Sequence, residues 1–177
     1  MSGTSIDGVD AALIDTDGIH QIDRLAFHSM PYEPEFADRV RAILGRAEAD
    51  AEIATVEREL TMLHAKAVGR LLESAGVGAD SVGVVGFHGH TIHHEPARGF
   101  TWQIGDGALL AAECGIDVVA CRRMLSGIIS IDIFAPDDFW NKAPFMGENW
   151  EEGDTAHLSP LPQGGPCLKS RSRAGNK

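Results

Sequence analysis

The chain has 177 residues, of which 44% are hydrophobic, and its formal net charge is −11 at pH 7. A chain of this length can bury one hydrophobic core, whereas two full lobes normally need more residues. The acidic balance argues against general affinity for nucleic acid or anionic membranes, and no apolar run is long enough to span a membrane. The three cysteines form no Cys-x-x-Cys pair and the start lacks a basic secretory signal, so we expect free thiols and a cytoplasmic protein.

The first eighteen residues combine glycines, hydroxyls and carboxylates with a short apolar run. Gly3 and Gly8 allow turn conformations and a close approach of the backbone to a ligand. Backbone N–H groups in such a turn can bind phosphate oxygens, and a carboxylate such as Asp7 can hold Mg²⁺ directly or through water. We expect a strand over residues 11–15 and a closing turn over 15–18. An ordinary tight hairpin is the alternative, because hairpin turns also need Gly and Asp.

Two stretches with helical spacing follow the hairpin. Residues 34–44 predict a helix that ends at Gly45. A longer helix is predicted to begin after an N-cap at Asp50 and to end at Gly76. Its predicted apolar stripe consists of Ile53, Val56, Leu60, Leu63, Ala67, Leu71 and Leu72. These elements precede a strand at 82–87, so the order favours an α/β fold.

Four histidines fall within seven residues after the predicted strand at 82–87: His88, His90, His93 and His94. Such a cluster could bind zinc or another divalent metal. No fourth ligand of the Cys or acidic type has convincing spacing, and Gly89 breaks strict strand geometry. We therefore favour a histidine-bearing loop over a metal site.

The segment Gln103-Ile-Gly-Asp-Gly107 precedes a predicted helix over about 107–113 and a strand over 117–120. Asp106 can cap that helix, and the helix N-terminus favours a neighbouring anion. A plain N-cap and turn is the alternative. A strand, a helix and a second apolar strand in this order predict parallel pairing in a layered fold.

Three ordered motifs resemble the anhydro-N-acetylmuramic acid kinases over about residues 1–120: Gly-Thr-Ser-x-Asp-Gly-x-Asp at 3–10, Gly-Phe-His-Gly-x-Thr at 86–91 and Gln-Ile-Gly-Asp-Gly at 103–107. The resemblance implies a partial ribonuclease-H-like lobe of the sugar kinase, actin and heat-shock ATPase superfamily. It also implies ATP and Mg²⁺ as cofactors and an amino sugar as substrate. The implied reaction phosphorylates 1,6-anhydro-N-acetylmuramic acid and opens its anhydro ring with water, giving N-acetylmuramic acid 6-phosphate in cell-wall (peptidoglycan) recycling.

The resemblance also assigns site residues. The implied ATP-phosphate hairpin consists of Gly3, Thr4, Ser5, Ile6, Asp7, Gly8, Val9 and Asp10, with Asp7 holding Mg²⁺ through water. The implied sugar cleft contains His88, Gly89, Thr91, Gln103 and Asp106. His90 departs from the family pattern, in which glutamine commonly stands at this position.

The family pattern is incomplete in this chain. Family members usually carry a strand before Met-Ser-Gly-Thr-Ser, and after the position of Ala120 an Asp-Phe-Arg segment, a second Asp and a Gly-Gly-Gln-Gly-Ala-Pro loop. An aspartate of that stretch is the family's general base, whereas residues 121–130 here read Cys-Arg-Arg-Met-Leu-Ser-Gly-Ile-Ile-Ser. No catalytic residue is therefore assigned. Asp132, Asp137 or Asp138 as a replacement base is a weaker alternative.

Composition changes at the same point. Residues 1–120 hold 19 acidic and 8 basic residues, whereas residues 121–177 hold 7 of each and five of the eight prolines. We predict a kinase-lobe fragment over 1–120 and a divergent, poorly ordered tail over 121–177. We expect a truncated copy with little or no turnover. The alternatives are a non-catalytic nucleotide- or sugar-binding remnant and, less favoured, a histidine-based metal-binding domain.

Overall fold

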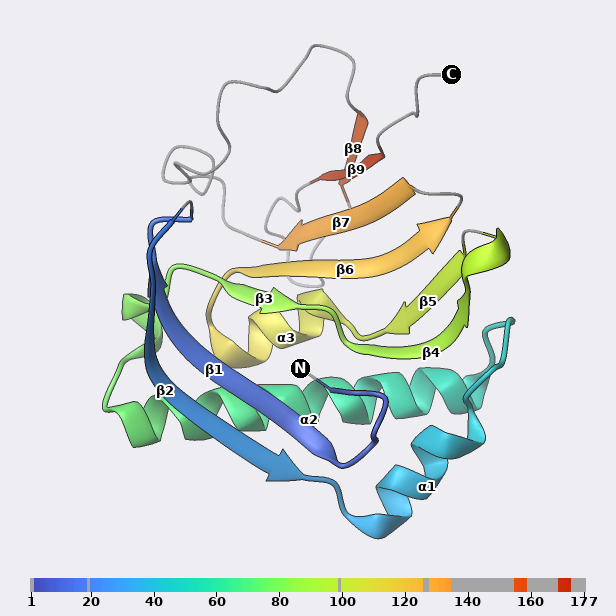
Figure 1. Cartoon of the computed structure of the whole chain (residues 1–177), viewed down its shortest axis with the longest axis horizontal. Coiled ribbons are helices and arrows are strands. Elements are labelled where there is room, and N and C mark those ends of the chain that lie inside the picture. Colours follow the sequence, from blue (N-terminus) through green and yellow to red (C-terminus); the bar gives the residue numbers. More distant parts are fainter. Residues whose placement is uncertain are drawn as a thin grey trace.

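A computed structural model of the chain describes residues 2–18, 20–98, 100–125, 128–134, 155–158 and 169–172 (Figure 1). The elements are β1 (Gly8–Thr16), β2 (Ile22–Pro31), α1 (Pro34–Ala42), α2 (Ala51–Ala75), β3 (Val85–Phe87), β4 (His90–Glu95), β5 (Phe100–Ile104), α3 (Gly107–Cys114), β6 (Val118–Leu125), β7 (Ile128–Phe134), β8 (Thr155–Leu158) and β9 (Lys169–Ser172). The fold is mixed α/β, as the element order predicted. None of the helices in these ranges is both long and apolar enough to cross a membrane.

Strands β1 and β2 form an antiparallel hairpin that makes a sheet of its own. Its closing turn is held by Asp17, whose Oδ1 accepts hydrogen bonds from the backbone N–H groups of His20 and Gln21. The predicted strand at 11–15 and the turn after it are thus confirmed. At the other end, a Cβ on Gly8 would lie 2.4 Å from the carbonyl oxygen of Met30, so only glycine allows the strands to meet there.

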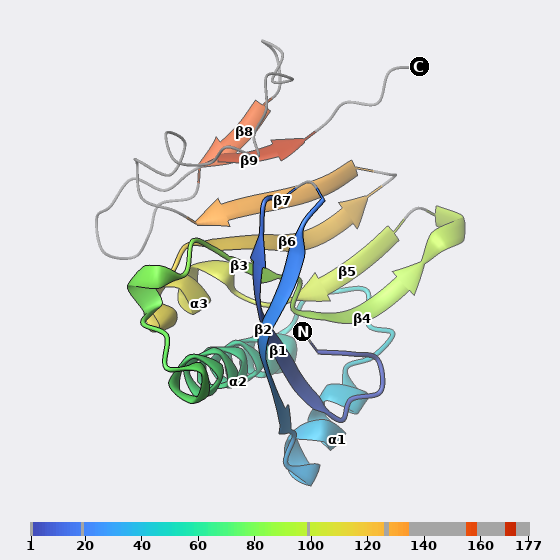
Figure 2. The same cartoon turned by 60° about the vertical axis from the view of Figure 1, so that its left-hand side comes forward.

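Helix α2 is the longest element and confirms the predicted caps. The Asp50 side chain accepts a hydrogen bond from the Ile53 N–H at 2.8 Å, and Gly76 ends the helix with φ +66° in the left-handed region. Six of the seven predicted stripe residues are buried, and Leu63 packs against the core while partly exposed. The helix contacts β1 and β2 along one side and α3 along another, as Figure 2 shows nearly end-on.

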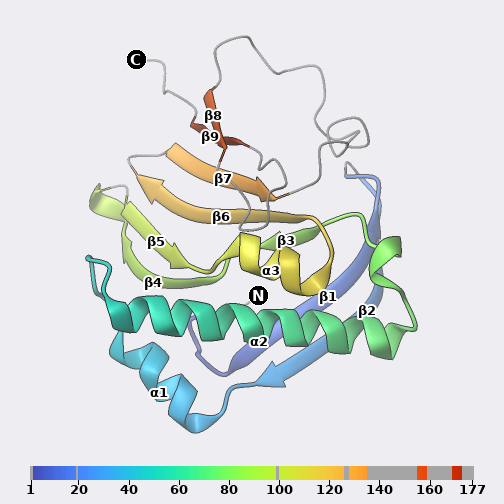
Figure 3. The same cartoon turned by 180° about the vertical axis from the view of Figure 1, so that it is seen from behind.

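The second sheet has the strand order β4-β5-β6-β7-β9-β8, with β3 paired to β6. Strands β3 and β6 are parallel, from Val85↔Val118 to Phe87↔Ala120, which confirms the predicted parallel element. The strand predicted at 82–87 is shorter than expected, since β3 covers only Val85–Phe87, and a 3₁₀ turn at Ala79–Ser81 precedes it. The predicted helix at 107–113 is α3, and Figure 3 shows α2 crossing the molecule between this sheet and α1.

Two groups of buried side chains hold these layers together. The larger joins the hairpin, α1, α2 and β4–β5 through residues such as Val9, Val40 and Leu60. The smaller joins α3, β3 and β6 around Phe87 and Leu110. Helix α2 contributes to the first group and contacts α3, which in turn contacts β6 and β7. It therefore connects the hairpin to the second sheet.

Strand β6 runs through the predicted boundary near Ala120 and pairs with β7 in antiparallel register. Of the predicted tail, the described parts are the end of β6, β7, β8 and β9, and these continue the second sheet. Most of residues 135–177, including Asp137, Asp138 and Cys167, lies outside the described residues. The domain boundary and the poor order of the tail stay predictions.

Candidate functional site

The turn before β1 exposes its polar side chains and buries its apolar ones. Thr4, Ser5 and Asp7 are exposed, whereas Ile6 is 5% exposed and belongs to the core. Ile6 has φ +54°, a left-handed conformation that is unusual for a β-branched residue and is held here by burial. The Ser5 hydroxyl donates to Asp7 Oδ1 at 2.7 Å, and this hydrogen bond lowers the pKa of Asp7. The turn therefore presents two hydroxyls and an ionised carboxylate to solvent.

A buried hydrogen-bonded chain joins this turn to strand β4. Ser2 Oγ lies 2.5 Å from Tyr32 Oη and 2.8 Å from His90 Nδ1. Ser2 and His90 are 3% and 0% exposed, and burial raises the pKa of Tyr32 to about 12. His90, which departs from the family pattern, thus ties β4 to the start of the turn. The prediction of a histidine-bearing loop is wrong for His90, His93 and His94, because residues His90–Glu95 form strand β4 and pair with β5.

The two glycine-bearing loops of the predicted sugar cleft lie in direct contact. Gly89 has φ +63°, and a Cβ there would lie 1.9 Å from the carbonyl oxygen of Ile104. A Cβ on Gly105 would lie 2.6 Å from Cζ of Phe87 and 3.1 Å from Cα of Gly89. The loops after β3 and after β5 can approach this closely only because both positions are glycine.

The remaining cleft candidates fall on these two segments. Gln103 Nε2 donates to Thr91 Oγ1 at 3.3 Å across the β4–β5 pair. Asp106 accepts a hydrogen bond from the Leu109 N–H at 3.0 Å and so caps α3, as predicted. His88 stands beside them, with a buried Nδ1 that has no hydrogen-bond partner among the described residues. The structure thus brings the five predicted cleft residues together, and their contact with a sugar stays a prediction.

Three polar residues of α2 were missed in the sequence, and they lie under this site. Glu57 Oε1 accepts from the Gly105 N–H at 2.8 Å, and Thr61 Oγ1 accepts from the Asp106 N–H at 3.0 Å. The His64 ring packs edge-on against Phe87, with centroids 5.0 Å apart. The available signal was their spacing: polar residues at i, i+4 and i+7 beside an apolar stripe share one helix face.

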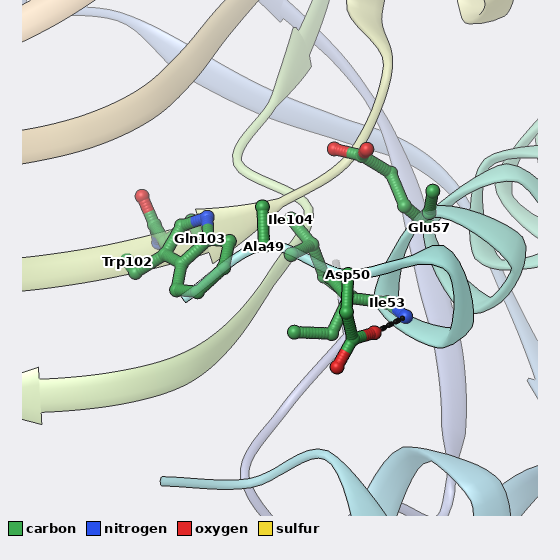
Figure 4. A pocket seen from close by; sticks show the side chains of 8 residues that line it. Ala49, Asp50, Ile53, Glu57, Trp102, Gln103 and Ile104 are labelled. Carbon is green, nitrogen blue, oxygen red and sulfur yellow. Dashed lines mark hydrogen bonds between the residues drawn. The ribbon is translucent and has the colours of Figure 1, made fainter. Parts of the chain in front are cut away.

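A pocket of about 270 Å³ opens between the start of α2 and β5 (Figure 4). Its lining residues are Ala49, Asp50, Ile53, Ala54, Glu57, Trp102, Gln103 and Ile104. Gln103 is the one predicted site residue among them, and no residue of the Gly3–Asp10 turn lines it. The pocket is therefore separate from the predicted phosphate turn.

The clustered histidines make divergent contacts. His93 Nδ1 lies 3.0 Å from the Gly45 carbonyl oxygen, and His94 Nδ1 lies 2.8 Å from Thr101 Oγ1. His90 bonds to Ser2 instead. In the part of the chain that the structure describes, no three His, Cys, Asp or Glu side chains converge as metal ligands. Cys114, the one cysteine whose side chain is described, is a free thiol.

Buried histidines make the stability of the chain sensitive to acid. His64 is 4% exposed, and its Nδ1 donates to the Leu60 carbonyl at 2.8 Å, so a second proton would sit on a buried Nε2 that has no described acceptor. Burial lowers the pKa of His64 to about 4, and it also lowers the pKa of His88 and His90. Since the unfolded chain keeps the ordinary pKa of 6.5, it binds more protons than the folded chain between pH 6.5 and about 4.

We therefore expect the free energy of unfolding to fall as the pH drops through this window. His64 alone accounts for a loss of roughly 3 kcal/mol by pH 4. Urea unfolding at half-unit steps from pH 8 to pH 4.5 measures the slope. His64→Leu should flatten it, whereas His20→Asn, at an exposed hairpin position, should leave it unchanged. An equal slope in His64→Leu and the wild type would contradict the assignment.

Comparison with known sequences matches residues 1–125 of this chain to one family. The family model described as anhydro-N-acetylmuramic acid kinase matches residues 1–125. Proteins of that name from Gluconobacter oxydans, Rhizorhabdus wittichii and Rhizobium etli are 52%, 49% and 48% identical over 124, 125 and 130 residues. The matches cover 67%, 67% and 70% of this chain and 34%, 34% and 35% of the relatives. The chain thus spans about a third of the length of these relatives.

Proposed function

The chain belongs to the anhydro-N-acetylmuramic acid kinase family, and from this premise we propose that residues 2–125 form the phosphate turn and one wall of the sugar cleft of an ATP-dependent sugar kinase. The proposed reaction transfers the γ-phosphoryl group of ATP to 1,6-anhydro-N-acetylmuramic acid and opens the anhydro ring with water. Its product is N-acetylmuramic acid 6-phosphate, and the proposed setting is cytoplasmic recycling of cell-wall sugar.

One observation carries this proposal: the polar turn and the two glycine loops adjoin. The buried Ser2–His90 hydrogen bond joins the start of the turn to β4, and the Gly89–Gly105 contact joins β4 to the loop before α3. A phosphate group at the turn would therefore lie beside a sugar held by the two loops. Phosphoryl transfer depends mainly on such positioning of the two reactants.

The turn also fits the cofactor that the proposal needs. Asp7 is exposed, the hydrogen bond from the Ser5 hydroxyl lowers its pKa, and the Thr4 and Ser5 hydroxyls lie beside it in the chain. A carboxylate of this kind would hold Mg²⁺ through water, and the ion would neutralise phosphate charge during transfer. The backbone N–H groups of Gly3–Asp10 would contact the phosphate oxygens of ATP.

We further propose that the described elements are part of a ribonuclease-H-like lobe. The β1–β2 hairpin, the parallel β3–β6 pair and the packing of α2 against the hairpin support this assignment. In the structure the hairpin stays a separate sheet, and an isolated bridge between Ser2 and Val9 marks the edge of β1.

The 177-residue chain by itself is proposed to turn over little or no sugar. It spans about a third of its relatives, and a single lobe cannot enclose ATP between two lobes. The general base is not assigned either. Asp132 belongs to β7, which pairs with β6, and its role as a replacement base stays a prediction.

A chimera tests the proposal. Residues 1–125 replace the matching third of the Gluconobacter oxydans relative, and formation of N-acetylmuramic acid 6-phosphate is measured by mass spectrometry. We expect turnover by the chimera, and weak binding of Mg–ATP and sugar without turnover by the 177-residue chain. The unmodified relative serves as the positive control. A folded chimera that is inert on the anhydro sugar would overturn the substrate assignment.

The same assay separates the alternative of a non-catalytic binding remnant. The retained turn and cleft residues favour that alternative for the chain as it stands. If the 177-residue chain binds ligand without turnover and the chimera is active, the chain is a binding remnant of a functional kinase lobe. Robust turnover by the 177-residue chain would refute the expectation that it is catalytically defective, while supporting the family reaction.

A further inference from the structure

Helix α2 holds the loop between β5 and α3 through two consecutive backbone N–H groups. The Gly105 N–H donates to Glu57 Oε1 at 2.8 Å, and the Asp106 N–H donates to Thr61 Oγ1 at 3.0 Å. Thr61 is 0% exposed, and its hydroxyl donates in turn to the Glu57 carbonyl at 2.8 Å. Glu57 and Thr61 lie one helical turn apart on one face of α2.

These two bonds supply partners that the loop lacks elsewhere. Residues 105 and 106 follow the end of β5 and precede α3, so their N–H groups take no part in the strand ladder or the helix ladder. Gly105 has φ +150°, a conformation open to glycine, and packs against Phe87. Without the α2 acceptors, two N–H groups of the loop would lose their hydrogen bonds.

The anchored segment carries two of the predicted cleft side chains. Gln103 precedes the anchored residues and Asp106 is one of them, and Asp106 also fixes the start of α3 through Leu109 N–H. We infer that Glu57 and Thr61 are positioning residues for the sugar site. Their hydrogen bonds fix the position of the Gln103–Gly107 segment relative to α2. This inference rests on the proposed function for its sugar, whereas the anchoring itself rests on the structure alone.

Nuclear magnetic resonance of the 177-residue chain can follow both halves of the inference in one sample. The first readout is amide hydrogen exchange at Gly105 and Asp106. Thr61→Val should speed exchange of the Asp106 amide by about tenfold or more, and Glu57→Met should do the same for the Gly105 amide. Thr61→Ser and Glu57→Gln keep an acceptor and should restore protection.

The second readout is the dissociation constant for 1,6-anhydro-N-acetylmuramic acid, titrated well below the unfolding temperature. We expect it to rise about tenfold in Thr61→Val and Glu57→Met and to return toward the wild-type value in Thr61→Ser and Glu57→Gln. Thr55→Val is the matched control, because the Thr55 hydroxyl makes the same kind of bond to a helix carbonyl, that of Ala51, on an exposed face. It should change neither readout.

The outcomes are distinct. Unchanged exchange at Gly105 and Asp106 in the Val and Met variants would overturn the anchoring. Faster exchange with an unchanged sugar dissociation constant would overturn the positioning role and leave the proposed function standing. A wild-type chain that binds no sugar would refute the proposed sugar site, and the positioning of a sugar with it, while exchange still decides the anchoring.

Discussion

Gly89→Ala is expected to destabilise the chain by about 3 kcal/mol or more, enough to unfold a marginal domain. Two costs add at this position. Gly89 has φ +63°, where an L-residue costs roughly 1–2 kcal/mol, and its new Cβ would lie 1.9 Å from the Ile104 carbonyl oxygen. The obstacle is backbone, so it cannot rotate away, and the two glycine loops must separate.

The chain offers a matched control for this substitution. Gly76 also has a left-handed φ, +66°, but nothing lies within 4 Å of a Cβ built there. Gly76→Ala should therefore cost only the conformational part, roughly 1–2 kcal/mol. Urea unfolding of both variants, followed by circular dichroism, measures the difference. Equal destabilisation of the two variants would show that the loops after β3 and β5 do not touch.

The local part of this fold could be predicted because short-range chemistry determines it. Asp50 and Gly76 bound α2 as a side-chain acceptor and a left-handed residue, and both signals are read within one turn of the helix. Asp106 caps α3 in the same way. The order strand, helix, strand also predicted the parallel pairing of β3 with β6, although the antiparallel pair β4–β5, which was not predicted, lies between β3 and α3 in the chain.

The contacts that build the candidate site are non-local, and single-sequence patterns do not contain them. Ser2 meets Tyr32 and His90 across separations of 30 and 88 residues. Glu57 meets Gly105 across 48 residues. In the helical pattern Thr61 and His64 only interrupt the apolar face. Their contacts are with residues of other segments, the Asp106 N–H and the Phe87 ring, which the local pattern does not contain. The separate hairpin sheet was unpredicted for the same reason, since a local pattern does not say which edges pair.

Asp7→Ala in the chimera is expected to lower kcat/KM for the anhydro sugar by about a hundredfold or more, the size seen when one group that organises transition-state charge is removed. The Asp7 carboxylate is exposed, and the hydrogen bond from the Ser5 hydroxyl lowers its pKa, so it is ionised at neutral pH. Its loss removes the group proposed to hold Mg²⁺ against the phosphates. The Mg²⁺ concentration for half-maximal rate should rise together with the loss of turnover.

Three variants give this expectation its controls. Asp15→Ala removes an exposed carboxylate from the same hairpin, outside the turn, and should leave turnover unchanged. Ser5→Ala removes the donor that lowers the pKa of Asp7 and should cost less than Asp7→Ala, because the carboxylate remains. Asp7→Glu keeps a carboxylate, so it should bring the Mg²⁺ concentration for half-maximal rate part of the way back to the value of the unmodified chimera.

If Asp7→Ala and Asp15→Ala had equal effects, Asp7 would contribute only surface charge, and the proposed Mg–ATP site at the turn would be wrong. If Asp7→Ala alone fails and added Mg²⁺ partly restores its rate, the turn acts as the metal-phosphate site, because extra ion compensates only for a lost ion contact.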